Sequence, residues 1–157
     1  MVKPAIALAL LLAAIVAGCD GPGIAPTTGE TGSMTARVNG RIWRSTTLTA
    51  AGRGTTTIAL HGTAMTPEGT EAVDILLNDV VAAESYRLGD EGTGAANIAV
   101  YSSAGHSFST ITANSGTVRI SEISSEGIKG MFGFSAGTVD DPSAVRVTEG
   151  SFSATFR

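Results

Sequence analysis

Residues 34–43 read MTARVNGRIW, and this stretch decides the fold that the sequence predicts. Apolar residues alternate with polar ones from Met34 to Val38, which is the period of a strand that buries one face. Asn39-Gly40 then separates this run from a second run that ends at Trp43. A type I′ turn needs positive φ at both central positions, and Asn-Gly adopts it readily. The stretch therefore predicts an antiparallel β-hairpin.

Similar short runs continue to the C-terminus, and turn residues such as Gly, Ser and Asp separate them. They cover residues 55–62, 71–78, 85–88, 95–102, 106–112, 116–124, 128–136 and 144–156. After residue 33, only residues 79–86 favour even a single helical turn. Many short strands joined by short links are typical of an all-β antiparallel meander.

We expect this meander to form one domain over residues 34–157, since 157 residues is the size of a single domain. It is predicted to close into a small barrel, and a two-sheet sandwich is the alternative. Two groups of residues are predicted to face the interior. The small ones are Ala36, Ala59, Ala99, Gly130 and Ala154. The aromatic ones are Trp43, Phe132, Phe134, Phe152 and Phe156.

The first 18 residues have the features of a secretory signal. Lys3 gives the N-terminus a positive charge, and residues 5–17 (AIALALLLAAIVA) contain no charged or polar side chain. An apolar segment of about 7–15 residues is typical of a signal peptide, whereas a membrane-spanning helix needs about 20. Residues 1–18 are therefore predicted to be a signal peptide that is removed from the mature protein.

Val16-Ala17-Gly18-Cys19 ends the apolar segment and resembles the lipobox of bacterial lipoproteins. Small residues before the cysteine let a peptidase bind extended backbone, and the thiolate is the nucleophile that takes a diacylglyceryl group. The resemblance implies that Cys19 is the lipid attachment site and carries fatty acyl chains such as palmitate. The mature protein is then expected in the cell envelope, anchored by lipid on the extracytoplasmic side of a membrane.

Residues 19–33 begin with the lipidated cysteine and are rich in Gly, Pro and Thr, which predicts a flexible tether. The whole chain carries 10 Lys and Arg against 14 Asp and Glu, so its formal net charge is −4. This acidic balance argues against a nucleic-acid-binding protein, because phosphate contacts need basic residues. It also predicts that the lipid on Cys19, rather than the protein surface, holds the chain at the membrane.

Several segments together resemble a family of small uncharacterised bacterial envelope lipoproteins. They are residues 35–40 (TARVNG) with Trp43, Tyr101, residues 130–134 (GMFGF) and residues 145–152 (VRVTEGSF). The resemblance extends from the first hairpin to the C-terminus and depends mostly on residues that pack strands together. It implies a calycin-like β-barrel domain and a place in the envelope, and it implies no particular chemistry.

The sequence contains few patterns that carry catalysis or metal binding. His61 and His106 lie in strand-like runs with no acidic or nucleophilic partner at a recognisable spacing, so both are expected at the surface. Residues 89–94 and 140–142 are acidic, but they lack the alternating oxygen ligands of a Ca²⁺ loop and are predicted to be turns. A single Cys excludes an intrachain disulfide and a Cys-rich zinc site. No catalytic residue, cofactor or metal site is predicted.

These observations predict a non-enzymatic envelope protein that binds or scaffolds at the membrane surface, with a protein partner that the sequence does not identify. The first alternative is a carrier that holds a small apolar ligand in the barrel, with some of the aromatic residues lining a cavity. The second alternative, which we favour less, is an enzyme. It would require His61 or His106 to lie beside a carboxylate in a pocket.

Overall fold

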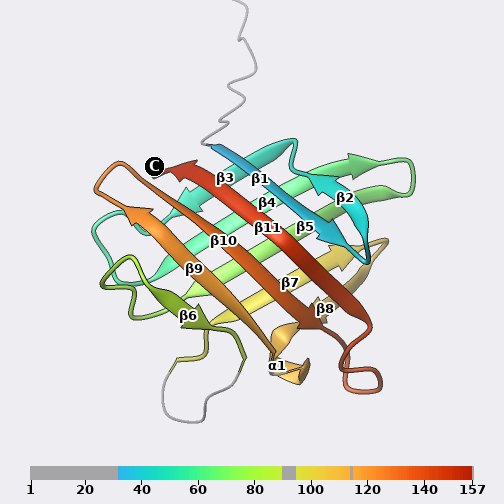
Figure 1. The fold of residues 1–157 in the computed structure, drawn as a ribbon. Coiled ribbons are helices and arrows are strands. Elements are labelled where there is room, and N and C mark those ends of the chain that lie inside the picture. Colours follow the sequence, from blue (N-terminus) through green and yellow to red (C-terminus); the bar gives the residue numbers. More distant parts are fainter. Residues whose placement is uncertain (1–31, 90–94, 114, 157) are drawn as a thin grey trace, which may run out of the picture.

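A computed structural model describes residues 32–89, 95–113 and 115–156. Within them the chain forms eleven strands and one short helix, α1 (Thr110–Ala113), as Figure 1 shows. The six-stranded sheet has the spatial order β2 (Arg41–Arg44), β1 (Gly32–Val38), β11 (Val145–Thr155), β10 (Gly127–Ala136), β9 (Ser115–Ile123) and β6 (Ser85–Arg87). The five-stranded sheet has the order β3 (Thr47–Ala51), β4 (Ile58–Thr66), β5 (Gly69–Leu77), β7 (Ile98–Ser103) and β8 (His106–Ser109). All the strand pairs within these two sheets are antiparallel, which confirms the predicted all-β antiparallel fold.

The two sheets lie face to face, and the strands of one cross those of the other in Figure 1. The chain passes from the six-stranded to the five-stranded sheet between β2 and β3. It returns to the six-stranded sheet once for β6, which pairs with β9, and again between β8 and β9. Isolated bridges join the sheets at Ala50–Phe156 and at Ser109–Gly137. The ladders of the described strands do not close into a barrel, so a two-sheet sandwich accounts for them equally well.

The first hairpin has the turn that its sequence predicts. Asn39 and Gly40 have φ values of 49° and 81°, and Val38 pairs with Arg41 across the turn. A second two-residue turn of the same kind joins β7 to β8, where Ala104 and Gly105 have φ values of 50° and 80°. These two turns lie at the same end of the molecule, as shown by Asn39 and Ala104, which line the same groove.

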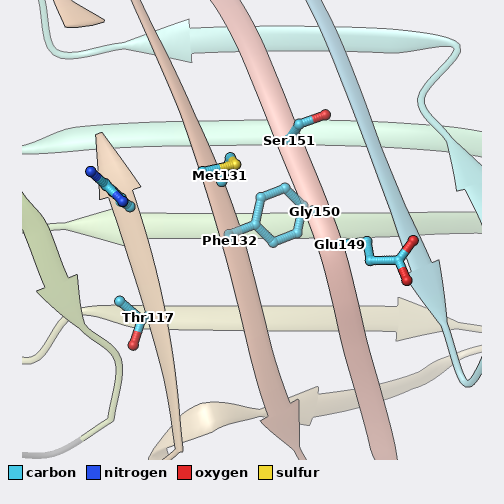
Figure 2. A pocket seen from close by; sticks show the side chains of 7 residues that line it. Thr117, Met131, Phe132, Glu149, Gly150 and Ser151 are labelled. Atoms are coloured by element: carbon cyan, nitrogen blue, oxygen red, sulfur yellow. The ribbon is translucent and has the colours of Figure 1, made fainter. Parts of the chain in front are cut away.

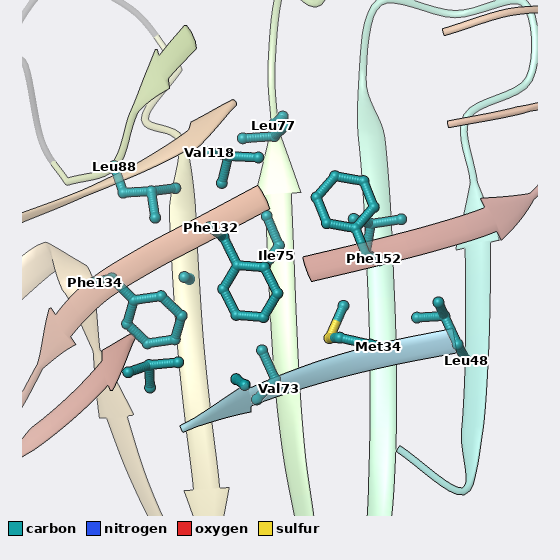
Figure 3. Packing of buried hydrophobic residues seen from close by; sticks show 14 of the residues in the cluster. Met34, Leu48, Val73, Ile75, Leu77, Leu88, Val118, Phe132, Phe134 and Phe152 are labelled. Carbon is teal, nitrogen blue, oxygen red and sulfur yellow. The ribbon is translucent and has the colours of Figure 1, made fainter. Parts of the chain in front are cut away.

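One hydrophobic core fills the space between the sheets (Figure 3). The inward row of β5 shows the pattern, since Val73, Ile75 and Leu77 are at most 1% exposed. All five aromatic residues that the sequence places in the interior are buried, from Trp43 at 1% exposed to Phe156 at 8%. The small residues Ala36, Ala99, Gly130 and Ala154 are buried as predicted as well.

Two reciprocal pairs of glycine and phenylalanine hold β10 against β11. Gly130 lies opposite Phe152, and Phe132 lies opposite Gly150. A Cβ on Gly130 would lie 2.7 Å from Phe152 Cζ, and a Cβ on Gly150 would lie 2.6 Å from Phe132 Cδ2. Each ring therefore covers backbone where only glycine leaves room. The centroids of the two rings are 6.3 Å apart, which is within the range of favourable aromatic pairs.

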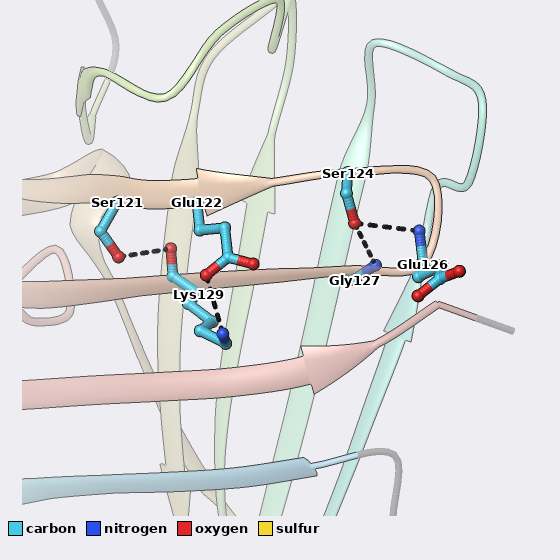
Figure 4. A network of polar contacts seen from close by, with 6 residues as sticks. All are labelled: Ser121, Glu122, Ser124, Glu126, Gly127 and Lys129. Atoms are coloured by element: carbon cyan, nitrogen blue, oxygen red, sulfur yellow. Dashed lines mark hydrogen bonds and ion pairs between the residues drawn. The ribbon is translucent and has the colours of Figure 1, made fainter.

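Hydroxyl groups close the hairpin between β9 and β10, as Figure 4 shows. The Ser124 hydroxyl accepts hydrogen bonds from the backbone N–H groups of Glu126 and Gly127, at 3.1 and 3.3 Å. Nearby, Lys129 Nζ lies 2.7 Å from Glu122 Oε2. The predicted turn at residues 125–127 is confirmed, and these contacts fix its register.

The structure differs from the sequence-based expectation at four places. Ala59 is exposed, because the buried neighbours Ile58 and Leu60 occupy the inward positions of β4. Residues 79–86 do not form a helical turn, since Asp79 adopts φ 54° and Ser85 already begins β6. The short helix α1 lies instead at the end of the run 106–112, which is predicted to be a strand. β3 is not among the predicted strands, although Thr47, Leu48, Thr49 and Ala50 alternate between polar and apolar types.

Neighbouring residues on β10 give a matched test of the core. Phe132→Ala should lower the free energy of unfolding by about 3–5 kcal/mol, because it removes a buried ring and leaves a cavity. Met131→Ala should cost less than about 1 kcal/mol, because Met131 is 53% exposed on the opposite face. Urea unfolding followed by the fluorescence of Trp43, the single tryptophan, measures both. Equal losses for the two variants would contradict this assignment of faces.

Candidate functional site

A groove of about 530 Å³ opens at the end of the two sheets where both two-residue turns lie. Its volume is within the range of small-molecule sites, which is roughly 300–1,000 Å³. We call it the end groove. Its polar lining comes from Asn39, Arg41, Glu71, Tyr101, Ser103 and His106. Its apolar lining comes from Val38, Ala104, Phe108, Ala144 and Val145.

The end groove exists because two inward-facing rows change from apolar to polar at this end. On β5 the inward row that contains Val73 ends at Glu71, which is only 4% exposed. On β2, Arg41 lies two positions before the buried Trp43 and therefore on the same side of the strand. Successive side chains of a strand alternate between faces, so these polar groups occupy positions that would otherwise belong to the core.

An ion pair connects these two rows across the gap between the sheets. Arg41 Nη2 donates to Glu71 Oε1 at 2.6 Å, and this hydrogen bond raises the pKa of Arg41. The side chain of Arg41 is 52% exposed, whereas that of Glu71 is 5% exposed. The pair is therefore asymmetric, because the carboxylate has lost most of its water and the guanidinium has kept about half of its surface.

The second carboxylate oxygen of Glu71 forms no regular hydrogen bond, although the Tyr101 phenol lies close enough to interact with this carboxylate. Within the described residues, Oε2 is buried and makes no hydrogen bond. Nearly all buried polar atoms in proteins are hydrogen-bonded, and leaving one unpaired costs roughly 1–3 kcal/mol. A buried acceptor at a groove is a position that a ligand with an N–H or O–H donor can satisfy.

Two aromatic rings form the wall of the end groove beside Glu71. Tyr101 on β7 and Phe108 on β8 stack with ring centroids 6.3 Å apart and an interplanar angle of 24°. Burial raises the pKa of Tyr101 above 10.0, and a hydrogen bond with Ser103 lowers it in part. The charge of Glu71 and a hydrogen-bonding interaction with its carboxylate raise the pKa further. The phenol therefore stays neutral at ordinary pH and contributes a hydroxyl beside an apolar wall.

The structure separates the two histidines. His61 lies on the outer face of the five-stranded sheet, and its Nδ1 is 2.5 Å from Asp74 Oδ1. Both side chains are about half exposed, so this pair is a surface contact. His106 is also exposed, as expected, but it lines the end groove together with Glu71. In the described part of the chain its ring makes no hydrogen bond that would orient it for catalysis.

The remaining predicted features are the acidic turns, the absence of a metal site and the N-terminal segments. Residues 140–142 form a turn, in which the backbone N–H of Thr138 donates to the carbonyl of Asp141 at 2.9 Å. No group of three or more His, Cys, Asp or Glu that could hold a metal occurs among the described residues. Residues 90–94, Cys19, the signal segment at 1–18 and nearly all of the tether at 19–33 lie outside the described residues.

No helix within residues 32–89, 95–113 and 115–156 is both long and apolar enough to cross a bilayer.

Sequence reasoning missed the central residues of this site, Arg41 and Glu71, although a signal for Glu71 was present. In the run EAVDILLN, Glu71 has the same parity as Val73, Ile75 and Leu77, so the alternation already places it on the buried face. A carboxylate on a buried row predicts a partner or a site. Arg41 gave no comparable signal, because its partner is 30 residues away in the sequence and lies in the other sheet.

Comparison with known proteins identifies a domain and nothing more specific. The family model for a domain of unknown function, DUF6252, matches residues 30–155. The match includes both sheets and every residue that lines the end groove. Comparison with curated proteins and with solved structures gives no match.

The asymmetry of the ion pair can be tested by removing its members separately. Arg41→Met should lower the free energy of unfolding by about 3 kcal/mol, because it leaves a buried carboxylate without its counter-charge. Glu71→Gln should cost less than half as much, because the exposed guanidinium stays hydrated. The double variant should recover most of the loss. Urea unfolding of the four proteins measures this cycle, and equal single losses would contradict the asymmetry.

Proposed function

Because the chain belongs to the DUF6252 family, whose function is unknown, we propose a function from its own geometry: it is a lipid-anchored, non-enzymatic binding protein of the cell envelope. Its ligand site is the end groove. The observation that carries this proposal is the buried oxygen of Glu71 that lacks a hydrogen-bond partner among the described residues. An acceptor in this position costs stability in the free protein, and a bound donor would recover that cost.

The lining of the end groove indicates the class of ligand. Arg41 and Glu71 cancel each other's charge, so the groove has no strong preference for an anion. Phe108 and Val145 offer an apolar wall, while Tyr101 and Ser103 add hydroxyl groups. The ligand that fits is a small molecule with one N–H or O–H donor for Glu71 and an apolar part for the wall.

The dense core argues for binding at the end of the sheets rather than between them. Met34, Trp43 and Phe132 are among the side chains that fill the interior, and each is at most 5% exposed. A carrier with an apolar ligand inside would have to displace such groups. If the two sheets are the halves of a calycin-like barrel, as the family resemblance implies, the end groove is its mouth.

Lipid attachment at Cys19 is the second part of the proposal. The described fold begins at Gly32, which pairs with Ala154 at one end of β1. Val38, at the other end of the same strand, lines the end groove. An anchor that precedes Gly32 would thus enter the domain at the end opposite the groove, and the groove would stay accessible to ligand.

Native mass spectrometry tests the ligand site. The sample is the chain from residue 19 with Cys19→Ser, incubated with a small-molecule extract of the cell envelope. We expect a retained adduct, which Glu71→Gln should weaken at least tenfold, because the amide cannot offer two carboxylate acceptors. His61→Gln is the matched control on the opposite sheet face and should retain the adduct. No adduct, or an adduct that Glu71→Gln binds equally well, would reject the end groove as the site.

The anchor has a separate test. In cells that express the full chain, the wild type should sediment with membranes and show the mass of a diacylglyceryl group on Cys19. The Cys19→Ser variant should lose that mass and its lipid anchor, because the nucleophile of the lipid transfer is absent. Labelling with a radioactive fatty acid gives the direct readout. Equal labelling of both proteins would overturn the proposed anchor.

A further inference from the structure

We propose that the outer face of the six-stranded sheet binds the anionic headgroups of a lipid bilayer. We call this surface the basic face. The inference goes beyond the proposed function, since it concerns neither the end groove nor the chemistry at Cys19. It begins with the distribution of charge, which the net charge of −4 conceals.

Basic residues are concentrated on this one surface. Of the 10 Lys and Arg residues, all except Lys3 and Arg157 are in the described part of the chain. Six of these eight project outward from the six-stranded sheet, on strands whose alternate residues are buried. They are Arg37, Arg44, Arg87, Arg119, Lys129 and Arg146. Charges gathered on one surface create a local potential that the net charge of the protein does not describe.

The strands of this sheet carry only two acidic residues within the described part, and each is paired. Glu149 Oε2 lies 2.8 Å from Arg37 Nε, and Glu122 Oε2 lies 2.7 Å from Lys129 Nζ. Most of the remaining acidic residues lie in turns or on the five-stranded sheet, whose outward strand positions hold the paired His61 and Asp74. The positive charge on the basic face is therefore only partly neutralised.

Three arginines on the basic face have unused side-chain donors. In the described residues, Arg44, Arg119 and Arg146 make no ion pair or hydrogen bond through their guanidinium groups. Hydroxyl groups lie next to two of them: Arg119 shares a shallow groove with Thr117 and Ser151, and Arg146 shares one with Ser115 and Ser135. Arginine together with Ser or Thr hydroxyls is the usual donor set for phosphate oxygens.

Two apolar side chains favour a lipid surface over a soluble polyanion. Ile42 is 58% exposed and Met131 is 53% exposed, and both project from the basic face. Figure 2 shows Met131 on β10 between Thr117 on β9 and Ser151 on β11. Exposed apolar side chains among arginines are stabilised when they insert at the boundary between headgroups and acyl chains, whereas a soluble polymer has no apolar layer into which they could insert.

The lipid anchor proposed above would keep this face close to a membrane. β1 belongs to the six-stranded sheet, and residues 1–31 precede it. An anchor within those residues would confine the domain near the bilayer, where weak attraction is enough to orient it. The end groove lies at the ends of the strands, so contact through the basic face would leave it accessible. This proposal differs from the expectation that the protein surface contributes little to attachment.

Vesicle co-sedimentation tests the proposal without the anchor. The protein is again the chain from residue 19 with Cys19→Ser. The vesicles consist of phosphatidylcholine alone, or of phosphatidylcholine with about 30% phosphatidylglycerol, which is anionic. We expect binding only to the anionic vesicles, and weaker binding as salt rises from low to physiological levels. The triple variant Arg44→Gln/Arg119→Gln/Arg146→Gln should weaken binding roughly 100-fold, or about fivefold for each arginine.

A second triple variant controls for net charge. Ala59→Glu/Met65→Glu/Thr70→Glu changes the net charge by the same amount, but on the outer face of the five-stranded sheet. It should bind anionic vesicles much better than the arginine variant does. Ile42→Ser/Met131→Ser should weaken binding while the salt dependence persists. Circular dichroism confirms that each variant is folded before its binding is compared.

Three results would overturn the proposal. The first is no binding to anionic vesicles at low salt. The second is equal loss in the two triple variants, which would mean that total charge, rather than this face, controls binding. The third is binding of soluble polyphosphate through the same arginines with none to vesicles, which would assign the face to a polymer. Because the protein carries no lipid, none of these outcomes depends on modification of Cys19.

Discussion

The reciprocal pairing of glycine and phenylalanine across β10 and β11 is the contact on which the rest of the structure depends. Phe132 and Phe152 each lie over a glycine of the neighbouring strand, so the two strands approach closely and the rings extend into the space between the sheets. There they meet the inward rows of the five-stranded sheet, such as Val73 and Ile75 (Figure 3). Because interiors are close-packed, the positions of these rings determine which other side chains the core can accept.

The end groove follows from the same packing. The apolar rows stop before the strands do, and the next inward positions hold Arg41 and Glu71. A carboxylate that continues a buried row loses its water, and only one of its oxygens finds a partner in the described residues. A structural ion pair would ordinarily satisfy both oxygens, since an unpaired buried acceptor has a cost. This imbalance is why we place the binding function at this end.

The outer surfaces of the two sheets differ in a way that their similar backbones do not suggest. Strand alternation exposes one row from every strand, and in the six-stranded sheet these rows carry most of the basic residues. The acidic residues lie largely elsewhere, so a protein of negative net charge presents a positive face. The groove and the basic face are thus separate surfaces of one domain, and the anchor that we propose before β1 would leave both accessible.

The sequence by itself determined the local structure and the faces of most strands. Asn39-Gly40 determined a turn because few other pairs tolerate two positive φ values, and the alternation around Val73 determined a buried row because side chains of a strand alternate. It failed at α1, and it misplaced Ala59 although the neighbouring Ile58 and Leu60 already indicate the inward positions of that run. Only the tertiary structure decided that Arg41 meets Glu71 and that the outward arginines share one surface. These relations join residues far apart in the chain, and the order of strands in a sheet, which no local pattern encodes, brings them together.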